Sequence, residues 1–300
     1  MHVEAGILVT TMRTEREMLQ IILDTAREDE RIRAVIMNGS RANPNASRDV
    51  FQDYDVVYIV TDPAPFRNNY EWIRRFGELM ILQEPDDMHV PPAESSAGFG
   101  YLMQFTDGNR IDLNIFPVEK LPQLKKDSLS LLLLDKDGRI GPFPAADERA
   151  YLPKPPTAKE FADCTNEFWW CCPYVAKGLW RGQILYAKSM LDDVVRAQLM
   201  KMLVWNIGIK TGFGVNPGKL GKYFERYLEP ELWQMLLRTY SDADYDRTWD
   251  ALLTMGVLFR SVAMTVAQHF GFTYPSEDDR RVTAHLEHVR RLPGDAVTIY

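Results

Sequence analysis

Residues 37–60 read MNGSRANPNASRDVFQDYDVVYIV, and this stretch decides how the first half of the chain folds. The apolar run 34–37 has the length and composition of a buried strand, and the chain turns directly after it, at Gly39, Ser40 and Arg41. Where a strand gives way to a loop or helix, backbone N–H groups can face an anion. The sequence therefore predicts an anion-binding turn at these three residues.

Two acidic residues, Asp53 and Asp55, open the second apolar run at 56–60. Side chains alternate between the two faces of a strand, so both carboxylates project to the same side. Mg²⁺ prefers a few carboxylates together with phosphate oxygens. We therefore predict that Asp53 and Asp55 are metal ligands.

A third carboxylate belongs to a later strand. Arg110, Asp112 and Asn114 share one face of it, and the apolar residues at 111, 113 and 115 take the other. A polar face inside an otherwise apolar sheet needs a reason. If this strand lies beside the first one, Asp112 completes a cluster of three carboxylates, whose like charges need a cation.

The chain changes character near residue 150. Before it, short helices and strands alternate, beginning with a capping box at 14–17 that opens a helix. Further on, the pattern predicts a helix at 68–77, a strand at 79–82, and strands at 101–105 and 111–116 joined by a turn. These elements predict a domain with a mixed sheet over residues 12–150 and an α+β fold for the whole chain.

Everything beyond residue 150 has helical patterning. Prolines at 153, 155 and 156 mark a linker, since proline continues neither a helix nor a strand. A second capping box, at 157–160, opens the first helix. The predicted helices cover 158–172, 174–194, 196–209, 219–227, 230–239, 244–270 and 277–291. We therefore predict an all-helical second domain over 151–295.

Composition excludes several classes of protein. The 300 residues include 35 basic and 42 acidic side chains, and the resulting net charge of −7 disfavours nucleic-acid binding. No uninterrupted apolar run approaches the roughly 18 residues that cross a membrane. Residues 1–11 lack the features of a secretory signal, and three cysteines cannot form a disulfide framework. We expect a cytoplasmic protein, in which residues 1–11 have no assigned role.

The ordered set of strand, Gly-Ser turn, Asp-x-Asp strand and later Asp resembles the nucleotidyltransferase superfamily with polymerase-β-like folds. Further stretches, and with them residues 12–295 as a whole, resemble the aminoglycoside 6-adenylyltransferases, which form the streptomycin adenylyltransferase family. These stretches are RIDLNIFP at 110–117 in the sheet half, and KGLWRGQILYAKSMLD at 177–192, GIKTGFGVNPGK at 208–219 and YPSEDDRRVTAHLEHVRRLP at 274–293 in the helical half. The three helical stretches are the more specific to this family.

This resemblance implies transfer of AMP from ATP to a hydroxyl of streptomycin, with release of pyrophosphate. It implies that Asp53 and Asp55 hold Mg²⁺ against the nucleotide phosphates and that Gly39 and Ser40 line the phosphate loop. Asp112 matches the third carboxylate of the family, which either shares a metal or accepts the proton of the attacking hydroxyl. The implied partners are ATP and a cationic aminoglycoside, with no nucleic acid and no membrane.

The helical half offers cations for the nucleotide. On a helix over 174–194, Lys177, Arg181, Lys188 and Asp192 fall on one face. Such a face is either solvated or contacts the triphosphate, and the resemblance favours Lys177 for that contact.

The same half offers aromatic and acidic side chains for the antibiotic. Streptomycin carries two guanidinium groups, which bind carboxylates and aromatic faces. The candidates are Glu167, Trp170, Asp192 and Asp193. The alternative for the aromatic residues near 168–170 is packing in a core.

Two other functions compete with this interpretation. A nucleotidyltransferase could modify another small antibiotic or a protein, and the same scaffold could serve as a non-catalytic nucleotide-binding protein. A binding protein has no need of three crowded carboxylates, which favours the enzyme.

Overall fold

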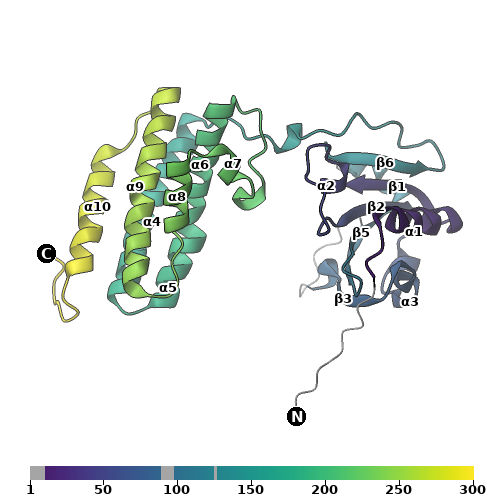
Figure 1. The fold of residues 1–300 in the computed structure, drawn as a ribbon, viewed down its shortest axis with the longest axis horizontal. Coiled ribbons are helices and arrows are strands. Elements are labelled where there is room, and N and C mark those ends of the chain that lie inside the picture. Colours follow the sequence, from purple (N-terminus) through teal and green to yellow (C-terminus); the bar gives the residue numbers. More distant parts are fainter. Residues whose placement is uncertain (1–10, 89–97, 125–126) are drawn as a thin grey trace, which may run out of the picture. The chain divides into compact units, whose positions relative to one another are not determined.

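The computed structural model describes residues 11–88, 98–124 and 127–300. The chain divides into two compact units, Met1–Ala150 and Tyr151–Tyr300, each with its own hydrophobic core (Figure 1). The first unit contains a mixed sheet with flanking helices, and the fully described second unit contains helices and no strand. The predicted α+β fold class is thus confirmed. Of the leader at 1–11, only Thr11 is among the described residues.

Within the described residues, the first unit is built on a six-stranded sheet with the order β3-β4-β5-β2-β1-β6. β2 and β5 run parallel, and the other neighbouring pairs are antiparallel. Because β2 and β5 are parallel neighbours, their first residues lie side by side at the same end of the sheet. The strands are β1 (Ile32–Asn38), β2 (Tyr54–Val60), β3 (Leu79–Gln83), β4 (Phe99–Phe105), β5 (Arg110–Pro117) and β6 (Ser130–Asp135).

Helix α1 (Glu15–Glu28) covers one face of this sheet. It begins with the predicted capping box, in which the Thr14 hydroxyl accepts from the Glu17 N–H and the Glu17 carboxylate accepts from the Thr14 N–H. Met18 and Ile22 of α1 are fully buried in the core on that face. Burying side chains of this size stabilises the fold by roughly 1.5–3 kcal/mol each.

The predicted helix at 68–77 is shorter than expected. It consists of α3 (Tyr70–Ile73) followed by the 3₁₀ turn η2 (Arg74–Phe76), and Gly77 ends it with a φ of +137°. A backbone angle in this range favours glycine, so the residue type stops the helix there.

The opposite face of the sheet has a smaller core. Ala34, Ile36, Val57 and Ile59 form it, together with apolar side chains between residues 116 and 143. Asp53 and Asp55 lie four and two positions before Val57. Because side chains alternate between the faces of a strand, both belong to the same face as Val57. The face is therefore apolar along the middle of β2 and acidic where β2 begins.

The second unit packs its helices around one core, which includes the stacked rings of Phe168 and Phe259, 3.7 Å apart. Figure 1 shows α4, α9 and α10 side by side, in agreement with their mutual contacts. The helices are α4 (Ala158–Trp180), α5 (Ile184–Ser189), the π-helical η6 (Met190–Val195), α6 (Arg196–Thr211), α7 (Phe224–Tyr227), α8 (Pro230–Arg238), α9 (Tyr245–Phe270) and α10 (Ser276–Arg291).

The single helix predicted over 174–194 is wrong. Pro173 lies inside α4, and the break comes instead at Gly182, whose φ of +69° is typical of the residue that ends a helix. Close packing accompanies this turn, because a Cβ on Gly178 would lie 2.8 Å from Cδ1 of Tyr186 in α5. α5 therefore folds back directly onto α4.

Helix α9 is, among the described residues, the one helix long and apolar enough to cross a membrane. Its buried side chains, such as Met255, Leu258 and Phe259, lie in the core of the second unit. The central helix of a globular core meets the same length and hydropathy criteria as a membrane span. The packing of α9 is that of a core helix.

Candidate active site

Three carboxylates meet where β2 and β5 begin. The parallel pairing sets Asp55 opposite Asp112, and Asp53 directly precedes β2 on the same face as Asp55. One oxygen of each carboxylate lies within 4.8 Å of one oxygen of each of the others. Asp53, Asp55 and Asp112 are called the carboxylate cluster below. Three hard oxygen donors around one point are a fitting ligand set for Mg²⁺.

The ionised carboxylates of the cluster repel one another. Burial raises the pKa of Asp55 from its ordinary value of 3.8 to about 6, and the charges of Asp53 and Asp112 add to this rise. A bound cation relieves such a penalty, because it stabilises the ionised form of every carboxylate around it. The electrostatics of the cluster therefore fit the predicted metal.

Arg110 is the cation already present beside the cluster. Its Nε and one terminal nitrogen donate to the two oxygens of Asp112, both at 2.7 Å, and Nε lies 4.0 Å from Asp53 Oδ2. A bidentate pair of this kind orients the carboxylate and offsets part of its charge. The sequence interpretation missed this role, although Arg110 and Asp112 lie two positions apart on one strand face.

A fourth carboxylate, Asp127, was not predicted. Its charge is among those that raise the pKa of Asp55, and its side chain accepts a hydrogen bond from the Leu129 N–H. Asp127 precedes β6, so it comes near β2 only because β6 pairs with β1. A pairing between distant strands leaves no signal in the sequence around Asp127 itself.

The Gly-Ser turn lies directly against the cluster. Gly39 begins the four-residue helix α2 (Gly39–Ala42), and a Cβ on it would lie 2.1 Å from Asp55 Oδ2. The Gly39 N–H donates to the Leu129 carbonyl, so it is not open to a phosphate. The Ser40 N–H, in the first turn of α2, has no intrahelical acceptor, and the Ser40 hydroxyl has no partner among the described residues. Ser40 therefore carries the polar groups of this turn that can receive a phosphate oxygen.

We expect Gly39→Ala to weaken both Mg²⁺ binding and turnover by about tenfold, the equivalent of ~1.4 kcal/mol. The new methyl group would displace the Asp55 carboxylate, and the φ of +70° would be strained for alanine. Calorimetric titration with Mg²⁺ measures the first effect without any substrate.

Gly108→Ala is the matched control for this substitution. Its φ of +89° is equally unfavourable for alanine, but no atom lies within 4 Å of the added Cβ. Equal losses in the two variants would show that backbone strain, and not contact with Asp55, causes the effect.

Arg41 binds the backbone directly before β2 and is largely buried. Its guanidinium donates to the carbonyl groups of Gln52 and Asp53, at 2.7 and 2.9 Å, and it stacks 3.6 Å from the centroid of the Tyr54 ring. Only 8% of the side chain is exposed. Arg41 therefore ties the Gly-Ser turn to the backbone that carries Asp53, and its contact with the nucleotide stays a prediction.

Two of the three helical cations predicted to bind phosphate share one cavity. Lys177 and Arg181 line a space of about 370 Å³ between α4 and the chain around and beyond the end of α10. Among the described residues, neither has a carboxylate at ion-pair distance. Lys188 lies on α5 and binds Asp192 at 2.9 Å and the Ser241 carbonyl at 2.8 Å. Lys188 and Asp192 therefore share a face as predicted and pair with each other, whereas Lys177 and Arg181 lie at the end of α4.

The four residues predicted for the antibiotic do not form one pocket. Trp170 lines a cavity between α4 and α10, whereas Glu167, Asp192 and Asp193 do not line it. Asp192 is held between Lys188 and Arg196, and Asp193 and Glu167 are exposed elsewhere on the unit. Trp170 is thus the member of this set that lines the cavity between α4 and α10.

The chain is similar to known proteins over most of its length. The profile of a family described as streptomycin adenylyltransferase matches residues 12–289. An aminoglycoside 6-adenylyltransferase from Bacillus subtilis (strain 168) is 41% identical over 270 residues, which cover 89% of this chain and 95% of that protein. Its counterpart from Campylobacter jejuni is 42% identical over 270 residues, with 90% and 93% covered. The one from Staphylococcus aureus is 34% identical over 267 residues, with 88% and 95% covered.

A solved structure gives a further comparison. The crystal structure of an aminoglycoside 6-adenyltransferase from Bacillus subtilis aligns with a TM-score of 0.46 and 37% sequence identity, covering 94% of this chain and 100% of that one.

Proposed function

The chain belongs to the streptomycin adenylyltransferase family, and we propose that it transfers AMP from ATP to a hydroxyl of a streptomycin-type aminoglycoside. It is an enzyme of the aminoglycoside 6-adenylyltransferase type. Mg²⁺ is the proposed metal and pyrophosphate the second product. The observation that carries this proposal is the carboxylate cluster, assembled by the parallel pairing of β2 with β5 beside the Gly-Ser turn.

In the proposed reaction, the antibiotic oxygen attacks the α-phosphorus of ATP. A bond forms between that oxygen and the phosphorus, the bond from the α-phosphorus to the bridging oxygen of pyrophosphate breaks, and the hydroxyl gives up its proton. Such transfers depend mostly on positioning and on neutralising charge. Mg²⁺, when bound, supplies positive charge to the phosphate oxygens.

Five residues of the first unit have separate roles in the proposed reaction. Asp53 and Asp55 hold the cation, and Ser40 offers its N–H and hydroxyl to a phosphate oxygen. Asp112 either shares the cation or accepts the proton of the attacking hydroxyl. Arg110 orients Asp112 through its two hydrogen bonds.

In the second unit, we assign the phosphate contacts to Lys177 first and Arg181 second. Both lack a carboxylate partner among the described residues, and both line the same cavity. The Lys177 ammonium lies 4.8 Å from the centroid of the Tyr174 ring, which keeps it over an aromatic wall of that cavity. Ammonium and guanidinium groups both bind phosphate oxygens strongly when freed from other partners.

A pyrophosphate assay tests the proposed function. The chain with ATP, Mg²⁺ and streptomycin is expected to release pyrophosphate and to yield an antibiotic heavier by one AMP group, as seen by mass spectrometry. Chelating the metal should stop both. Turnover with a lincosamide or with protein, but with no aminoglycoside, would contradict the substrate class. Turnover with none of them would support a nucleotide-binding protein instead.

A further inference from the structure

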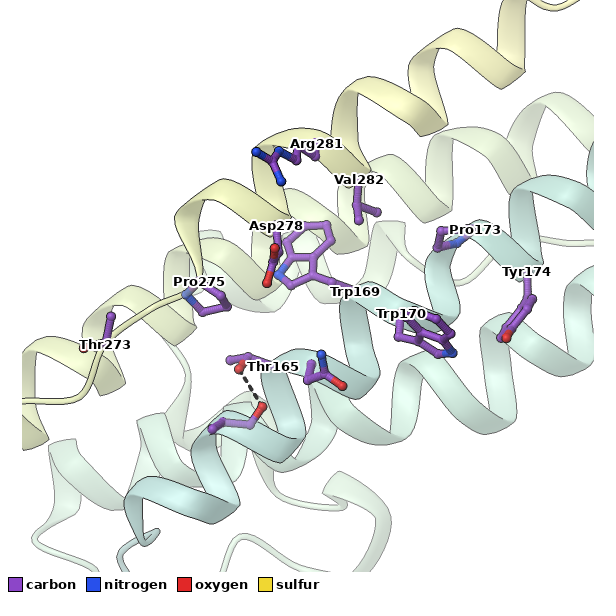
Figure 2. A pocket seen from close by; sticks show the side chains of 12 residues that line it. Thr165, Trp169, Trp170, Pro173, Tyr174, Thr273, Pro275, Asp278, Arg281 and Val282 are labelled. Atoms are coloured by element: carbon purple, nitrogen blue, oxygen red, sulfur yellow. Dashed lines mark hydrogen bonds between the residues drawn. The ribbon is translucent and has the colours of Figure 1, made fainter. Parts of the chain in front are cut away.

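An aromatic groove lies between α4 and α10. It has a volume of about 750 Å³, and Figure 2 shows side chains from the two helices facing it from opposite sides. Trp170 on its rim is 64% exposed. Tryptophan is mostly buried in folded proteins, so an exposed one beside a cavity indicates a surface for a ligand. The groove is defined by Trp169, Trp170 and Tyr174 of α4, and by Pro275, Asp278 and Val282 at α10.

The Trp169 wall of the groove is held in place from behind. The Trp169 indole N–H donates to the Tyr274 hydroxyl at 3.2 Å, and that hydroxyl donates to Asp279 at 2.7 Å. Arg260 binds both oxygens of Asp279, which is only 3% exposed. A satisfied buried network of this kind keeps its members rigid. A ligand therefore meets a preformed surface, and little is lost in ordering it.

Asp278 supplies the free charge of the groove. It is exposed and has no hydrogen-bond or ion-pair partner within the described part of the chain, and it lines the groove together with Trp169 (Figure 2). Arg281 also lines the groove, but it is paired with Glu277 at 2.8 Å. A free carboxylate beside aromatic faces favours a flat, weakly hydrated cation.

The groove adjoins the cavity of Lys177 and Arg181, because Pro173 and Tyr174 line both. One side of this shared wall presents indoles and a carboxylate, and the other presents two cations. The second unit thus offers separate surfaces for a cationic and an anionic group. An enzyme that joins a cationic antibiotic to a nucleotide needs both kinds of surface.

We propose that the aromatic groove binds a guanidinium group of the aminoglycoside, with Asp278 as its carboxylate partner and Trp170 as its stacking face. This inference rests on the proposed function, since it locates the substrate of that reaction. A guanidinium is planar, stacks on aromatic rings and donates two parallel hydrogen bonds to a carboxylate. Both features of the groove match it.

Titration calorimetry of streptomycin into the full chain, without ATP, tests the groove. Trp170→Leu and Asp278→Asn are each expected to raise the Kd by roughly tenfold, and Trp170→Phe by no more than about threefold, since it keeps an aromatic face. Glu287→Gln is the matched control, because it removes the same charge from an exposed position on α10 outside the groove. Trp170 and Asp278 are exposed, so circular dichroism should report an unchanged fold.

The pyrophosphate assay separates this inference from the proposed function. If the wild-type chain modifies streptomycin but Trp170→Leu and Asp278→Asn bind it with the wild-type Kd, the groove assignment is overturned and the proposed function stands. If Glu287→Gln weakens binding as much as Asp278→Asn, the effect is one of general charge and the assignment is also overturned. If the wild-type chain neither binds nor modifies an aminoglycoside, both proposals fail.

Discussion

Replacing Asp55 by asparagine is expected to lower AMP transfer by roughly 10³-fold, the loss typical of removing one preorganised charge-stabilising group. The amide cannot bind Mg²⁺ as the carboxylate does. Within the carboxylate cluster, Asp55 lies directly against Gly39 and opposite Asp112 on the neighbouring strand. Single-turnover kinetics with saturating ATP measure the loss.

The same variant is expected to be more stable than the wild-type chain when no metal is present. The pKa of Asp55 is raised to about 6 in the folded protein, so the folded protein binds the Asp55 proton more tightly than the unfolded chain does. The resulting penalty is absent well below pH 4, builds as the pH rises to about 6 and is complete above that. Asparagine removes it, and we expect a Tm about 2–4 °C higher at pH 8.

Calorimetric melting at two pH values checks this stability difference. At pH 8, Mg²⁺ should raise the Tm of the wild-type chain much more than that of Asp55→Asn. At low pH, where the wild-type Asp55 is protonated, the two proteins should melt together. Equal Tm values at pH 8 without metal would show that the cluster is not strained by its charge.

The second large effect is expected from Asp112→Asn, which should weaken Mg²⁺-ATP binding and lower turnover together. One oxygen of Asp112 lies within 4.8 Å of an oxygen of Asp53 and of an oxygen of Asp55, which favours a shared metal ligand. Arg110 donates one hydrogen bond to each Asp112 oxygen, which leaves a lone pair on each oxygen for a metal ion. Calorimetry of Mg²⁺-ATP binding, set beside the single-turnover rate, measures both quantities.

A different outcome would assign Asp112 a different role. Unchanged Mg²⁺-ATP binding with a chemical step slowed by about 10²–10⁴-fold would identify it as the general base. Unchanged binding with an unchanged rate would leave Asp112 a purely structural residue, and the three-carboxylate interpretation would be wrong.

Features that depend on neighbours in the chain were predictable. The capping boxes at Thr14 and Thr157 formed as expected, because each joins groups only three residues apart. The same holds for the polar face of β5, whose exposure alternates along the strand from Arg110 onward. Where a helix ends was less predictable: Pro173 was tolerated inside α4, and packing against α5 placed the turn at Gly182.

The sequence by itself determined which side chains share a face: Asp53 with Asp55, and Asp112 opposite its apolar neighbours. Only the tertiary structure decided that Asp55 and Asp112 pair in one register, and that Arg41 binds backbone carbonyls. It alone brought Trp170 and Asp278 to one groove. Side-chain alternation follows from local backbone geometry, whereas register and helix packing are set by burial summed over segments far apart in the chain. A long side chain such as arginine then takes whichever acceptors that packing brings within its reach.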